Sequence, residues 1–150
     1  MSIRAIPLLV FAFILYNLIV FSMGGEDTTG VLCAAGATCP AVALTKPIFS
    51  VTLLSGGVWT FRWGDLILLV TMGLLFAEIV KSTFSSTSTL IDHALSMVVF
   101  IAILVEFLMV PQAATSVFFL VLIASLVDVI AGYTIGIRVA RRDLNIGADH

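Results

Sequence analysis

The chain has 150 residues, of which 61% are hydrophobic and 11% are charged, and its mean hydropathy is +1.21. This composition lies far outside that of soluble domains and predicts an integral membrane protein. The formal net charge is -2 and the basic residues are spread thinly, which excludes a basic surface for nucleic acid. No repeat of fixed period occurs, so residues 1–150 are predicted to form a single transmembrane domain.

The first apolar run extends from Ile3 to Met23 and has the length of one membrane crossing. A secretory signal peptide is the alternative. However, the run is longer than the usual apolar region of such peptides, and no A-x-A-like cleavage site follows it. We therefore expect a retained transmembrane helix over residues 3–23, with Pro7 in its first turn, where the missing N–H donor costs nothing.

The long connection that follows covers residues 24–60, and its glycine, proline and threonine content disfavours a continuous helix. We expect its apolar segment, residues 48–54 (IFSVTLL), to lie along the membrane surface or against the helix ends. Trp59 and Trp63 come next, and Tyr16 lies toward the same end of the first helix. Such amphipathic rings favour the membrane interface.

Three further apolar runs predict crossings at about residues 63–83, 90–110 and 114–138. Thr89 followed by Asp92 matches the start of a helix, because the hydroxyl caps a backbone donor and the acid faces the positive end of the helix dipole. Few residues separate the last two crossings, so these helices are expected to be antiparallel neighbours. The predicted fold class is therefore all-α, an integral membrane bundle of four transmembrane helices.

Basic residues orient this bundle, since four crossings place both termini on one side of the membrane. Five basic residues then share that side: Arg4, Lys81, Arg138, Arg141 and Arg142. Two lie on the other side, Lys46 and Arg62. The positive-inside rule thus predicts cytoplasmic termini, a cytoplasmic tail at 139–150 and a periplasmic loop at 24–60. The expected location is a bacterial inner (plasma) membrane.

Four carboxylates lie within or beside the predicted crossings and are candidates for a proton or cation path: Glu78, Glu106, Asp128 and Asp92. At about 1.5 Å per residue, Glu78 and Asp128 fall in the inner half of the bilayer, and Glu106 falls in the outer half near Asn17. Acids inside a membrane are expensive to bury and suggest a functional site. The alternative is that each acid is protonated or bonded to a neighbouring helix, and only fixes the packing.

The fourth crossing carries small residues at a spacing of four, with one acid among them: Ala124, Asp128, Gly132 and Gly136. Small residues at this spacing let helix backbones approach closely. We expect this stripe to be a helix-packing face, either inside the bundle or toward another subunit.

Cys33 and Cys39 fall in the loop assigned to the oxidising periplasm, where a disulfide between them is expected. Small four-helix membrane proteins that pass electrons between a disulfide and a quinone typically rely on a C-x-x-C pair. Here five residues separate the cysteines and no other cysteine exists. A redox relay would therefore lack a second pair of cysteines with which to exchange electrons. A structural disulfide is the favoured interpretation.

Only two histidines occur, His93 and His150, and their positions do not support a haem held between facing helices. A metal site built from Asp92, His93 and Glu78 is an alternative to a solvated helix end. We expect no cofactor and no metal.

The predicted function is association without catalysis, as a small accessory subunit of a membrane complex or as a homo-oligomer. The small size, the stripe on the fourth crossing and the lack of a complete catalytic constellation motivate this prediction. The expected partners are the lipid bilayer and other membrane subunits or copies of the chain. Two alternatives stay open: a small proton- or cation-conducting channel or transporter that uses the intramembrane carboxylates, and a periplasm-facing thiol-disulfide/quinone redox enzyme.

Overall fold

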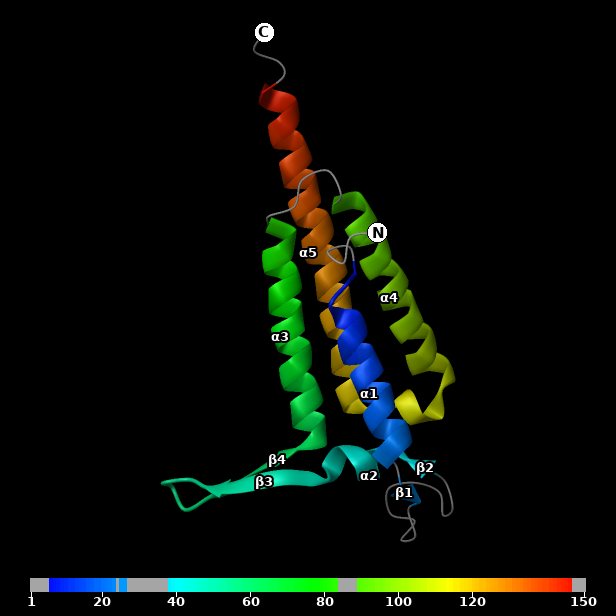
Figure 1. Cartoon of the computed structure of the whole chain (residues 1–150), viewed down its shortest axis with the longest axis vertical. Coiled ribbons are helices and arrows are strands. Elements are labelled where there is room, and N and C mark those ends of the chain that lie inside the picture. The colour runs from blue at the N-terminus through cyan, green and yellow to red at the C-terminus, as the bar shows by residue number, and fades with distance from the viewer. Residues whose placement is uncertain (1–5, 24, 27–37, 84–88, 147–150) are drawn as a thin grey trace.

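A computed structural model describes residues 6–23, 25–26, 38–83 and 89–146, with side chains described for 6–23, 42–83 and 93–138 (Figure 1). Helices make up 78% of the described residues, which confirms the all-α class. The four longest helices lie side by side: α1 (Leu9–Met23), α3 (Trp63–Thr83), α4 (Thr89–Met109) and α5 (Ser116–Ile146).

Successive long helices run in opposite directions. The start of α1, the end of α3 and the start of α4 lie toward one end of the bundle, and α5 projects beyond them on that side (Figure 1). The 3-10 helix η2 (Pro111–Ala113) joins α4 to α5 at the other end. Among the described residues, two helices are long and apolar enough to cross a membrane, over Trp63–Thr83 and Ser116–Arg138, whereas Leu9–Met23 and His93–Met109 are shorter apolar helices.

The helix bounds differ most from the predicted ranges near the two ends of the chain. Helix α1 begins at Leu9, after Pro7, whose carbonyl oxygen accepts a hydrogen bond of 3.2 Å from the N–H of Val10. A residue that precedes proline is biased away from helical conformation, so the helix starts beyond it. Helix α5 continues to Ile146 because the sequence after Arg138 loses hydropathy but keeps good helix formers such as alanine, arginine and leucine.

The connection between α1 and α3 contains more regular structure than the sequence suggested. It holds a short helix, α2 (Pro40–Thr45), and two antiparallel strand pairs: β1 (Gly25–Glu26) with β2 (Thr38–Cys39), and β3 (Pro47–Thr52) with β4 (Val58–Arg62). The β3–β4 hairpin projects sideways from the end of the bundle (Figure 1). Its turn closes at Gly56, whose φ of 82° suits a residue without a side chain.

Tyr16 is buried in the core rather than placed at an interface. Its ring lies 4.5 Å from that of Phe118 on α5. Its hydroxyl donates to the carbonyl oxygen of Gln112 at 3.0 Å and lies 2.7 Å from Oγ1 of Thr115. Because α1 is apolar all round, its sequence does not reveal which face is buried, and this contact with the α4–α5 connection could not be predicted.

Candidate functional site

The carboxylate of Glu78 holds the start of α1 against the end of α3. This buried group accepts a hydrogen bond of 2.7 Å from the backbone N–H of Leu8 and forms an ion pair of 3.0 Å with Nζ of Lys81. The Lys81 ammonium also donates to the carbonyl oxygen of Ile6 at 3.3 Å. The first N–H groups at a helix start lack partners within the helix and carry partial positive charge, so this carboxylate stabilises the start of α1.

Asp128 lies at the same end of the bundle and joins α5 to α4. Its buried carboxylate lies close to the hydroxyl of Ser96, which is buried as well. A serine hydroxyl can donate to a carboxylate, which in its ionised form only accepts. Asp128 also lies near enough to Glu78 and Lys81 to interact electrostatically with both. The charged groups of α3 and α5 and the hydroxyl of Ser96 on α4 therefore form one connected region.

The stripe of small residues on α5 lies inside the bundle. The ring of His93 packs over Gly132 and Gly136, and it stacks on Tyr133 with ring centroids 6.0 Å apart. A Cβ atom at Gly132 would lie 2.6 Å from Cε1 of His93, so only glycine fits beneath the ring. Ala124, one turn before Asp128, is buried in a cluster with residues of α1 and α3. Each stripe residue thus contacts a helix of its own chain.

His93 itself occupies a place that the sequence did not suggest. It was expected at a solvated helix end, yet only 7% of its surface is exposed. The two glycines of α5 make room for an imidazole between the helices. Ser96 follows His93 by three residues and so shares its face of α4. A polar pair at this spacing in an apolar run, matched by glycines on another helix, is the signal that could have revealed the contact.

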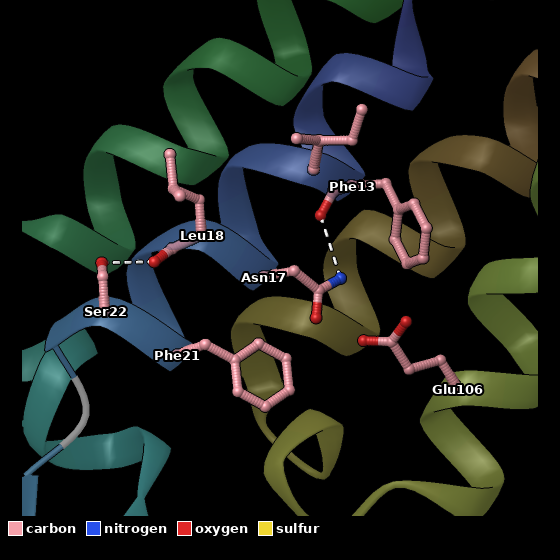
Figure 2. Close-up of a pocket in the computed structure, with 7 residues that line it drawn as sticks. Phe13, Asn17, Leu18, Phe21, Ser22 and Glu106 are labelled. Atoms are coloured by element: carbon pink, nitrogen blue, oxygen red, sulfur yellow. Dashed lines mark hydrogen bonds between the residues drawn. The ribbon is translucent and has the colours of Figure 1, made fainter.

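A separate polar pair lies toward the other end of the bundle, between α1 and α4. The side chains of Asn17 and Glu106 point toward one another (Figure 2). The Asn17 amide donates to the carbonyl oxygen of Phe13 on its own helix at 3.1 Å. The amide of Asn17 is thus bonded to its own helix. The carboxylate of Glu106 keeps free acceptor capacity, since it can accept about four hydrogen bonds when ionised.

This pair lies in a groove of about 680 Å³, lined mainly by apolar side chains: Phe13, Ile14, Asn17, Leu18, Phe21, Ser22 and Glu106 (Figure 2). The groove opens along the side of the bundle, because Leu18 and Phe21 on its wall are 63% and 66% exposed. We name it the α1–α4 groove. Its chemistry suits an apolar side chain or helix that brings a hydrogen-bond donor or a positive charge to Glu106.

The remaining predicted site residues lie where the structure gives no side-chain position. Asp92 falls on the first turn of α4 and Cys39 falls on β2, but their side chains are outside the described part, and Cys33 is outside it altogether. The expected disulfide therefore stays a prediction, and the alternative of a metal site with Asp92 stays untested. Among the residues with described side chains, no group of three or more histidine, cysteine or acidic residues could hold a metal ion.

Comparison of the chain with protein-family models, with curated proteins and with solved structures finds no match. The functional interpretation therefore rests on the geometry of these two regions.

Proposed function

We propose that the chain is an integral membrane protein in which α1, α3, α4 and α5 all cross the bilayer. The two shorter apolar helices support this proposal because large apolar side chains cover their outer surfaces. On α1, Phe11 and Ile14 are 52% and 54% exposed, and on α4, Val98 and Leu108 are 61% and 72% exposed. A helix that packs in a bundle in water normally carries polar residues on that side, so these surfaces suit lipid.

The orientation of the proposed bundle follows from its basic residues. Lys81 lies at the end that holds the start of α1, whereas Lys46 and Arg62 lie at the root of the hairpin, at the opposite end (Figure 1). With the additional arginines at the start and the end of the chain, the positive-inside rule favours cytoplasmic termini. A bacterial inner membrane with the hairpin on the periplasmic side is the location that we propose.

Within this membrane, we propose that the protein acts by association with other membrane chains, either copies of itself or a larger complex. The observation that carries the proposal is the position of Glu106 in the α1–α4 groove. Ionisable side chains inside a membrane almost always face a protein interior or a water-filled cavity. In a bilayer, a groove that opens along the side of the bundle would expose Glu106 to lipid unless another chain covers it.

Typical energies make an uncovered Glu106 unfavourable. Insertion scales give roughly 2.5–3.5 kcal/mol for an acid at the centre of a membrane helix, which is an upper bound for Glu106, near the end of α4. Hydrogen bonds between membrane helices average about 0.6 kcal/mol and rarely exceed about 1.7 kcal/mol. The neighbouring Asn17 amide, which donates to the carbonyl oxygen of Phe13, therefore does not offset the cost of the acid. A helix that enters the groove with a donor would add a hydrogen bond and remove the carboxylate from lipid.

The conduction hypothesis receives less support from the same contacts. Glu78 is held by Leu8 and Lys81, and Asp128 is buried beside Ser96, so both inner acids have neighbours that favour a packing role. A relay would require these groups to exchange their partners in order to pass a proton or cation. Ion flux through the purified protein in vesicles, lost in Asp128→Asn while assembly persists, would favour conduction over association.

The proposal can be tested by photo-crosslinking in the native membrane. A photoreactive amino acid in place of Leu18 probes the groove, and the same replacement of Leu69 on α3 is the matched control, because these leucines are 63% and 62% exposed. We expect protein adducts from position 18 and mainly lipid adducts from position 69. Adducts of twice the chain mass would identify a homo-oligomer, and larger ones a subunit of a complex. Equal protein crosslinking at both positions, or none at position 18, would contradict the role of the groove.

A further inference from the structure

The β3–β4 hairpin has two chemically different faces. Its register pairs Phe49 with Phe61 and Val51 with Trp59, so these four side chains share one face. The rings form a cluster: Phe49 and Phe61 stack with centroids 5.1 Å apart, and Trp59 lies within 6.0 Å of both. The pair between Ser50 and Thr60 belongs to the opposite face. One face is therefore aromatic, and the other carries the hydroxyl groups of Ser50, Thr52 and Thr60 together with Val58.

The helix bundle leaves the aromatic face and the tip of the hairpin uncovered. Every residue of β3 is exposed, and Trp59 on β4 is 49% exposed. At the tip, Leu54 is fully exposed and Leu53 is 51% exposed. An isolated two-stranded hairpin is only marginally stable in water, and exposed apolar side chains of this size add to the cost. The hairpin needs an apolar environment that the described part of its own chain does not supply.

The root of the hairpin is fixed to the helix ends. The Lys46 ammonium donates to the carbonyl oxygen of Met23 at the end of α1 at 2.9 Å. The N–H of Arg62 donates to the carboxylate of Asp65 in the first turn of α3 at 2.9 Å, so β4 passes directly into the capped start of that helix. Because the hairpin projects sideways from this root (Figure 1), it runs across the direction of the helices.

We propose that the β3–β4 hairpin is a lipid-binding anchor that lies in the interface of the outer leaflet. The proposal rests on the four-crossing bundle proposed above, which places the hairpin root at the membrane surface. The aromatic face and the two tip leucines enter the boundary between headgroups and acyl chains, where tryptophan is enriched. The hydroxyl face points to water. Lys46 and Arg62 lie at headgroup level, where they can meet anionic phosphates.

Tryptophan fluorescence can test this placement, because the chain contains only Trp59 and Trp63. The Trp63→Phe variant makes Trp59 the single probe in nanodiscs of phosphatidylcholine and phosphatidylglycerol, whose two surfaces are both accessible. We expect phosphatidylcholine with brominated acyl chains to lower the emission of Trp59 roughly twofold and aqueous iodide to lower it little. Strong quenching by iodide without quenching by brominated lipid would overturn the proposal and would instead favour a protein partner on the periplasmic side.

A matched variant tests which face meets the lipid. In Trp59→Phe/Thr60→Trp/Trp63→Phe, the single tryptophan moves by one residue to the hydroxyl face of the same strand. We expect this probe to respond to iodide more than to brominated lipid. Equal lipid quenching of both probes would contradict the facial arrangement. Extraction of the native membrane at alkaline pH separates this proposal from the proposed bundle, because release of the protein would refute the crossings themselves.

Discussion

The two ends of the bundle place their carboxylates in different surroundings. Glu78 and Asp128, at the end where α1 begins, are buried among groups of their own chain, and Glu78 is bonded to Leu8 and Lys81. Glu106, toward the other end, is half-buried beside Asn17 in a groove that opens outward. Acids in similar apolar helices can thus have different roles. An enclosed acid holds its own bundle together, and a laterally open one is available to another chain.

The most disruptive test of this contrast is Glu78→Leu. The substitution leaves the N–H of Leu8 without its acceptor and Lys81 without its counter-charge. Breaking a buried ion pair typically costs about 3–5 kcal/mol, and we expect about 3 kcal/mol because Lys81 is 25% exposed and can reach water. The free energy of unfolding in detergent, measured by denaturant titration, checks this value. A loss no larger than that of Glu106→Leu would contradict the difference between the two ends.

The next effect concerns the contact of His93 with α5. In Gly132→Ala the new methyl group would overlap the imidazole, and overpacking of this kind costs roughly 1–3 kcal/mol. Gly73→Ala on α3 is the matched control, since a Cβ atom there meets nothing within 4 Å. We expect the control to be neutral or to stabilise by about 0.5–1 kcal/mol through helix propensity. Thermal unfolding of both variants measures their change in stability, and equal changes would argue against a tight contact at Gly132.

The end of the bundle near Glu106 derives its stability from Tyr16 rather than from the acid. Tyr16→Phe keeps the ring against Phe118 but removes the bonds to Gln112 and Thr115. We expect a loss of about 1 kcal/mol in the free energy of unfolding, the usual value for such a bond. Tyr133→Phe, at a ring that is 45% exposed, should change stability little. If the two variants lost the same stability, the importance of the Tyr16 hydroxyl would be disproved.

The smallest effect on the isolated chain should come from Glu106. We expect Glu106→Leu to change the free energy of unfolding by less than about 1 kcal/mol, because the side chain lies in an open groove beside Asn17 rather than among enclosing partners. Its association should weaken roughly tenfold, which corresponds to about 1.4 kcal/mol. Native mass and complex recovery after gentle solubilisation measure this loss. Glu106→Gln, which keeps an acceptor, should retain most of the association, and unchanged assembly in Glu106→Leu would refute the proposed function.

The sequence alone determined the all-α class of the fold. Long apolar runs of helix-forming residues require backbone groups to pair within each segment, so a mostly helical chain follows from composition and run length. The same reasoning predicted Glu78, Glu106 and Asp128 as residues of interest, because a lone charge in an apolar run is conspicuous in any sequence. It did not predict the β3–β4 hairpin, although residues 48–54 were expected at the membrane surface.

Only the tertiary structure decided which of these residues are enclosed. A helix that is apolar all round has no amphipathic pattern to reveal its buried face, and this holds for α1, where Tyr16 and Asn17 are neighbours in sequence but face different surroundings. The partners that settle the environment of each polar group come from distant positions: Leu8 meets Glu78 across 70 residues, and Tyr16 meets Gln112 across 96. Helix packing makes these pairs, and local sequence patterns do not encode it.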